Sequence, residues 1–162
     1  MSRPASNRSR ALLAALALCL PLAPAQALPS TFGPVIGSAL LCRSHLDNAY
    51  FHSWLEAAFG PSYKHEGGAY WFKAPDATLW GTPVSEIIVS DDTSPLVFVG
   101  AVAESTPEQL EQSIHAAAGM RYLAADGSRY PLRVSNPGST IAYFNAKSKI
   151  YCARFKPLPP GR

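Results

Sequence analysis

The middle of the chain reads Val84-Ser-Glu-Ile-Ile-Val-Ser90, then Asp91-Asp-Thr-Ser-Pro95, then Leu96-Val-Phe-Val-Gly-Ala-Val102. The first run is rich in β-branched residues, which favour strands, and the last is apolar almost throughout, as a centrally placed strand is. The residues between them are typical of a turn that joins neighbouring strands. This stretch therefore predicts two adjacent strands of a sheet, with the second strand near its centre.

A helix is predicted directly after this strand pair. Thr106-Pro107-Glu108-Gln109 places a hydroxyl at the N-cap, Pro at the first helical position and Gln at the third, which is a capping box. Leu110, Ile114 and Ala117 form an apolar stripe at helical spacing, and Gly119 ends the helix. Three further strands are predicted over residues 129–134, 140–145 and 149–155, with a short extended piece over 121–123.

The N-terminal half has the same order of elements. Helical spacing runs from Ser38 to Phe59 and ends at Gly60-Pro61, with a weak point at Asp47-Asn48 where the helix starts late or breaks. The short aromatic strand Ala69-Tyr-Trp-Phe-Lys73 follows a turn at Gly67-Gly68. The sequence thus predicts an α+β fold, in which two helices pack on an antiparallel sheet in the order α-βββ-α-βββ.

The two halves also share a register, which suggests a duplicated αβββ unit. Residues 56–60 resemble residues 115–119 at an offset of 59, and Tyr63 matches Tyr122 at the same offset. The tandem layout is loosely analogous to small exported inhibitor proteins built from repeated helix-plus-sheet units. Such an analogy concerns the fold and carries little functional weight.

The first 27 residues have the three-part pattern of a secretory signal peptide. Arg3, Arg8 and Arg10 precede roughly ten apolar residues, and Ala25-Gln-Ala27 is a small-residue cleavage site. The apolar run is too short to span a bilayer, which needs about 20 residues. We therefore predict export to the periplasm or the extracellular space. The alternative is a lipoprotein cleaved at Cys19, where the bulky Leu18 is unfavourable.

Removal of residues 1–27 changes the charge of the protein. The full chain of 162 residues has 14 Lys+Arg, 11 Asp+Glu and a formal net charge of +3. Three of these basic residues and none of the acidic ones lie in residues 1–27, so residues 28–162 carry 11 of each and are neutral. A neutral chain without a basic run argues against nucleic acid as a partner. No membrane span is predicted in the mature chain.

Two of the three cysteines, Cys42 and Cys152, remain after cleavage. In an oxidising compartment an even pair predicts a disulfide, and a pair of free thiols is the alternative. We expect residues 28–156 to form a single α+β domain, followed by a mobile Pro-rich tail over 157–162.

Three polar residues of the first predicted helix could bind a metal. His45, His52 and Glu56 share one face of a continuous helix, but they lack the spacing of a known metal motif, and a solvated polar face explains them as well. His65-Glu66 could act as an acid/base pair, although adjacent side chains usually diverge. The oxygen-rich residues 90–94 could hold calcium, or could form a capped turn. No nucleophile motif is present, and we predict no metal and no cofactor.

The aromatic residues carry the functional prediction. In a strand, Trp71 points away from Tyr70 and Phe72, so one side of the sheet presents an aromatic surface. The alternative is that the Pro-rich connection Pro75–Pro83 covers this side. We predict an exported protein that recognises another envelope or secreted macromolecule, most simply a protein, through this surface, as an inhibitor, immunity or accessory protein. The predicted anchors and rim are Trp71, Tyr70, Trp80, His65 and Asp92. The alternatives are an envelope-directed hydrolase with a His/acid site and a carrier of a small apolar ligand.

Overall fold

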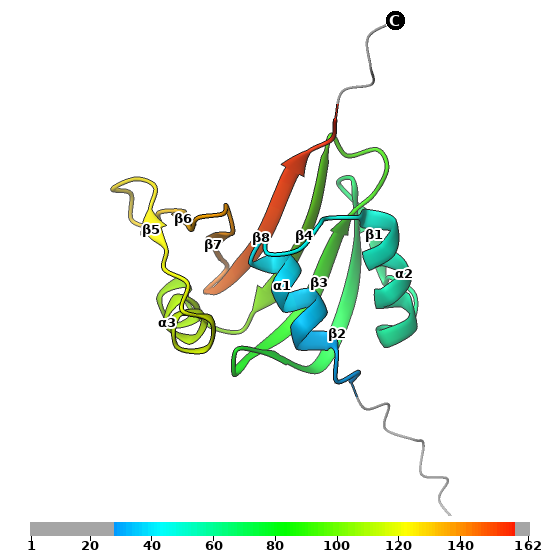
Figure 1. Ribbon diagram of the computed structural model, residues 1–162, viewed down its shortest axis with the longest axis horizontal. Coiled ribbons are helices and arrows are strands. Elements are labelled where there is room, and N and C mark those ends of the chain that lie inside the picture. Colours follow the sequence, from blue (N-terminus) through cyan, green and yellow to red (C-terminus); the bar gives the residue numbers. More distant parts are fainter. Residues whose placement is uncertain (1–27, 158–162) are drawn as a thin grey trace, which may run out of the picture.

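The computed structural model describes residues 28–157, in which all eight strands form one antiparallel sheet in the order β1-β2-β3-β4-β8-β7-β6-β5 (Figure 1). The predicted α+β class is confirmed. The predicted signal peptide (1–27) and most of the predicted tail (158–162) lie outside the described residues. The helical elements are a π-helical turn (Gly33–Gly37), α1 (Ser38–Leu40), α2 (Asn48–Phe59) and α3 (Pro107–Ala118). The strands are β1 (Lys64–Glu66), β2 (Ala69–Leu79), β3 (Thr82–Ser90), β4 (Leu96–Ala103), β5 (Leu123–Ala124), β6 (Arg133–Val134), β7 (Thr140–Phe144) and β8 (Lys147–Phe155).

The helical stretch predicted over residues 38–59 is interrupted between α1 and α2. Cys42 adopts a left-handed backbone conformation (φ 56°), which ends the first helical segment. Asp47 then begins α2 as its N-cap, accepting a hydrogen bond from the Tyr50 amide at 3.0 Å. The break occurs near the weak point at Asp47-Asn48.

β2 is longer than predicted, because it continues through Pro75. β1 pairs with β2 only over Ala69–Trp71, so Pro75 lies where β2 is the edge of the sheet and its missing amide hydrogen interrupts no pairing with β1. Asp76 has a positive φ of 58° within an irregularity of the β2–β3 register.

The strand predicted over residues 129–134 is shorter than expected, since only Arg133–Val134 pairs as β6. The residues before it form a turn in which the Asp126 carboxylate accepts from the Ser128 amide. By contrast, α3 begins as predicted, with both hydrogen bonds of the Thr106–Gln109 capping box present.

The two halves have matching arrangements. After the π-helical turn and α1, each half consists of a 12-residue helix followed by four strands, one strand more than predicted, and the sheet order is symmetric about the β4–β8 pair. The N-caps Asp47 and Thr106, and the C-caps Gly60 and Gly119, all recur at the offset of 59. Duplication of an ancestral unit remains a prediction.

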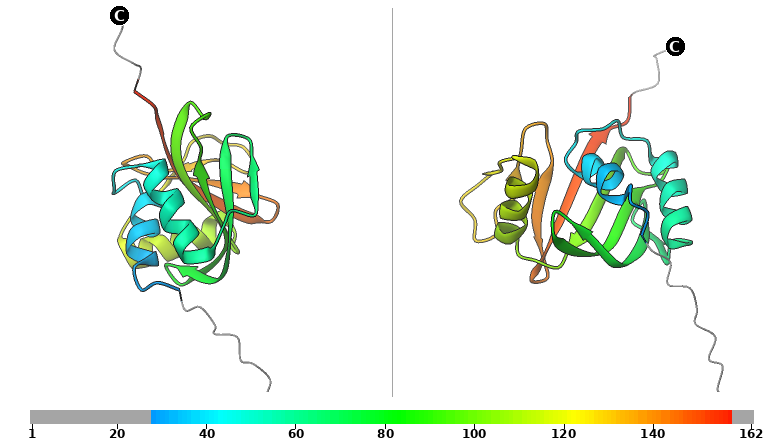
Figure 2. Two further views of the ribbon diagram at one scale, coloured as in Figure 1. Left: turned by 90° about the vertical axis from the view of Figure 1, so that its right-hand side faces the viewer. Right: turned by 60° about the horizontal axis from the view of Figure 1, so that its bottom comes forward.

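The helices pack on one face of the sheet and form the core with it. Figure 2 shows α1 and α2 on the same side of the strands. α3 belongs to the same core through Leu110 and Ile114, which are buried with Ile141 and Ile150 of the sheet. The predicted Cys42–Cys152 disulfide is confirmed and joins the turn after α1 to β8 across a Cα–Cα distance of 5.3 Å. No helix within residues 28–157 is both long and apolar enough to cross a membrane.

Candidate functional site: an aromatic sheet face

No helix within residues 28–157 packs on the second face of the sheet. Side chains alternate along a strand, so residues of one register row share a face. Phe72, Val89 and Val99 point to the helices, whereas Trp71, Ile88 and Gly100 form a paired row on the opposite side. We call this helix-free side of β1–β4, β8 and β7 the open face.

Aromatic side chains gather on the open face. Trp71, Phe98 and Phe144 are partly buried and pack around a small apolar cluster whose members are Ala69, Ile88 and Val102. Beside this cluster lies a depression of about 400 Å³, lined by Trp71, Phe98 and Tyr151 among others. Gly100 lines the depression, and it has no side chain to occupy the space. The open face therefore presents aromatic side chains around a depression. Residues that dominate the binding energy of protein interfaces are often aromatic and cluster around such pockets.

Four lysines lie on the open face, and three of them pair with acids. Lys64 lies 3.1 Å from Glu66, Lys147 lies 2.6 Å from Glu104, and Lys73 pairs with Glu86. The remaining one is the unpaired Lys149, which no carboxylate reaches within 4.0 Å in the part of the chain that the structure describes.

Lys149 is held among aromatic rings instead. Its Nζ lies 4.2 Å from the ring centroid of Phe144 and 5.1 Å from that of Trp71, while Lys64 Nζ lies 4.3 Å from Trp71. Burial lowers the pKa of the Lys149 ammonium from its ordinary value. The centre of the open face is thus an aromatic surface with one partly desolvated cation.

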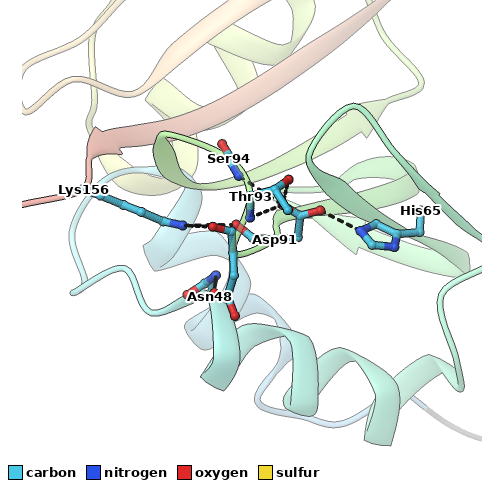
Figure 3. A network of polar contacts seen from close by, with 7 residues as sticks. Asn48, His65, Asp91, Thr93, Ser94 and Lys156 are labelled. Atoms are coloured by element: carbon cyan, nitrogen blue, oxygen red, sulfur yellow. Dashed lines mark hydrogen bonds and ion pairs between the residues drawn. The ribbon is translucent and has the colours of Figure 1, made fainter.

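A second feature, on the helix side of the sheet edge, is a polar cleft of about 300 Å³ between α2 and the β3–β4 turn. His65 Nε2 lies 2.6 Å from Asp91 Oδ2. Figure 3 shows His65 and the turn residues Thr93 and Ser94 converging on Asp91. Because the ionised carboxylate can only accept, Nε2 carries the proton of the imidazole. The ring of His65 also stacks on Tyr70 at 4.1 Å between centroids.

The Asp91 carboxylate closes the turn. Its Oδ1 accepts from the amide and hydroxyl of Thr93 at 2.8 and 2.7 Å and from the Ser94 amide at 3.1 Å. The bonds from Thr93 and His65 lower the pKa of Asp91 to about 2. These hydrogen bonds occupy the Asp91 carboxylate oxygens that would have to bind a calcium ion. The structure therefore favours the second interpretation of residues 90–94, a capped turn.

Asp91→Asn is expected to reduce the loss of stability in acid. The folded-state pKa of about 2 lies below the ordinary value of 3.8, so the ionised carboxylate stabilises the fold above about pH 4 and this contribution is lost as the pH falls toward 2. Urea unfolding at pH 5 and pH 2.5 measures the difference, which should be smaller in the variant than in the wild type. Asp92→Asn is the control, because the Asp92 side chain accepts from Asn48 at the surface. An equal pH dependence in wild type and Asp91→Asn would contradict this assignment.

The shared helix face that His45, His52 and Glu56 would need to bind a metal does not form. His45 lies in the connection before α2, so it shares no helix with His52 and Glu56, which contact each other at 3.6 Å. Nowhere within residues 28–157 do three His, Cys, Asp or Glu side chains gather as metal ligands. His65 and Glu66 lie on opposite faces of β1: His65 contacts Asp91, whereas Glu66 pairs with Lys64 on the open face.

The five predicted binding residues lie in three places. Trp71 lies on the open face, whereas Tyr70, His65 and Asp92 line the polar cleft. Trp80 occupies the tight turn between β2 and β3, where its indole packs beside Gly37 on the helix side. The predicted anchors therefore do not form one surface.

The open face also contains residues that the sequence did not single out, among them Phe98 and Lys149. The alternation of side chains within each strand indicates which residues share a face of the sheet. Only the order of the strands shows that these residues lie around Trp71. In comparisons with family models, curated proteins and solved structures, none matches the chain.

Proposed function

We propose that the chain is an exported binding protein that captures a partner protein across its open face. The observation that carries the proposal is the aromatic depression around Trp71, on the sheet face that no helix of the described part of the chain covers. Trp and Tyr are enriched among the residues that dominate binding energy at protein interfaces. An inhibitor, immunity or accessory role is the form of binding that we favour.

The shape and the charge of this face favour a protein partner. Small-ligand sites are concave and bury most of the ligand, whereas this depression is an open part of a broad sheet surface. Three of the four lysines are neutralised by neighbouring glutamates, so the face lacks the row of free cations that a nucleic-acid backbone requires. The disulfide supports export, because such bonds persist in oxidising compartments.

A hydrolase is the second candidate, and the His65–Asp91 pair is the observation that favours it. A buried carboxylate that holds one imidazole nitrogen leaves the other available as a general base. Ser53, His52 and Tyr70 line the same cleft. This candidate predicts that His65→Ala abolishes hydrolysis of cell-envelope esters or peptides while Trp71→Ala retains it.

Site-specific photo-cross-linking in the source cells tests the binding proposal. A photoreactive phenylalanine at Phe144 reports on the open face, and the same residue at Tyr50, an exposed aromatic of α2, is the matched control on the helix side. We expect one discrete protein adduct from position 144 and none from position 50. Equal adducts from both positions, or an adduct from position 50 alone, would argue against the open face.

Gly100→Val is expected to weaken capture without unfolding the domain. A Cβ at this position meets its nearest neighbours, Ile150 O and Tyr151 Cβ, at 3.5 and 3.6 Å, which are ordinary contacts. Valine also favours a strand, and its methyl groups would occupy part of the depression that Gly100 lines. We expect at least a tenfold loss of affinity for the cross-linked partner, on the scale of a lost interface anchor. Unchanged affinity in a folded variant would show that the depression is not used.

A further inference from the structure

Lys149 is placed by the sheet register at the centre of the open face. It lies on β8 opposite Val102 of β4 and Ala142 of β7, so its side chain shares the side of the sheet that presents Trp71. The aliphatic stem and ammonium are partly buried between the rings of Trp71 and Phe144. A partner lying across this face therefore has to meet the ammonium group.

The acids around Lys149 are already occupied. Glu86 accepts from the Tyr63 hydroxyl at 2.8 Å and pairs with Lys73, and its pKa is lowered from the ordinary value by these donors despite its partial burial. Glu66 and Glu104 are held by Lys64 and Lys147. Lys149 is thus the cation of this face that lacks a carboxylate among the described residues.

Further desolvation of an unpaired ammonium is costly. A protein interface that covered Lys149 with apolar surface alone would remove the remaining water from its ammonium group. No hydrogen bond or ion pair would then replace the lost hydration. A carboxylate provides the compensation, because hydrogen bonds between charged groups are roughly twice as strong as neutral ones. The adjacent depression over Gly100, lined by Phe98 and Tyr151, fits an apolar or aromatic side chain.

We infer that the partner of the open face is a protein segment that sets an Asp or Glu carboxylate against Lys149 and an apolar side chain into the neighbouring depression. This inference rests on the proposed function. It commits to one acidic group and not to a polyanion, because Lys64, Lys73 and Lys147 are already paired with glutamates and leave, among the described residues of this face, a single free cation for the partner.

Selection from a display library of random cyclic peptides supplies a defined probe. The full mature protein is the target, and peptides are kept when Trp71→Ala abolishes their binding. We expect these peptides to be enriched in an acidic residue next to an aromatic or aliphatic one. Fluorescence anisotropy then gives the affinity of the best peptide for wild type and variants.

A charge exchange tests the pairing itself. Lys149→Met keeps the aliphatic stem of the side chain and removes its charge. It should lower the affinity for the acidic peptide by about tenfold or more. Lys147→Met is the matched control, since that lysine is already paired with Glu104, and it should change the affinity less than threefold. Lys149→Glu should reject the acidic peptide and regain binding when the acidic residue of the peptide is replaced by Lys.

The outcomes separate the two proposals. Peptides that depend on Trp71 but carry no acidic residue, and that bind Lys149→Met as tightly as wild type, would overturn the carboxylate inference and leave the binding face in place. Failure to recover any Trp71-dependent peptide, together with cross-linking from the helix side, would overturn the proposed function. Tighter binding of oligo(dT) than of any peptide would overturn both.

Discussion

Loss of the disulfide is expected to lower the free energy of unfolding by about 4–5 kcal/mol, the chain-entropy figure for a loop of roughly this length. Cys42 and Cys152 are separated by 110 residues, so the bond restricts nearly the whole unfolded domain. Cys152→Ala is the preferred variant, because it removes the bond and leaves Cys42, which has a left-handed backbone conformation, unsubstituted. Urea unfolding of wild type and variant measures the change.

Reduction of the wild-type protein provides the control for this experiment. Because Cys152 is fully buried, Cys152→Ala also loses some packing, whereas reduction leaves both side chains in place. We expect reduced wild type to be destabilised nearly as much as the variant. A shift below about 1 kcal/mol on reduction would contradict a stabilising role for the bond.

Trp71→Ala is expected to lower the affinity for the cross-linked partner by about 30-fold or more. Truncation of a central interface tryptophan commonly costs about 2 kcal/mol or more of binding free energy. Trp71 packs on the small outer cluster and not in the main core, so the variant should remain folded. Tyr50→Ala, on the helix side, is the matched control and should bind as wild type. Equal binding by Trp71→Ala and wild type in titration calorimetry would remove Trp71 from the interface.

The parts of the fold that were predicted depend on local signals. The capping box at Thr106 and the stop at Gly119 determine α3 within a few residues of the chain, and both ends agree with the structure. The passage of β2 through Pro75 depends on where β1 ends, which is a property of the assembled sheet. The local sequence around Pro75 therefore could not predict how far β2 extends.

The candidate site shows the same division. Strand alternation predicted that Trp71 and Tyr70 point to opposite sides, and the structure places one on the open face and the other in the polar cleft. Lys149 comes from a strand nearly 80 residues later and meets Trp71 only because β8 pairs with β4. The His65–Asp91 pair likewise joins residues 26 positions apart, which no local pattern brings together.

The most direct test of the binding face is a methyl NMR spectrum of the protein titrated with its cross-linked partner. Ile88 and Val102 belong to the open face, whereas Leu55 of α2 and Ile114 of α3 are buried in the main core between the helices and the sheet. We predict that the partner shifts or broadens the methyl signals of Ile88 and Val102 and leaves those of Leu55 and Ile114 in place. Changes confined to Leu55 and Ile114 would contradict capture across the open face.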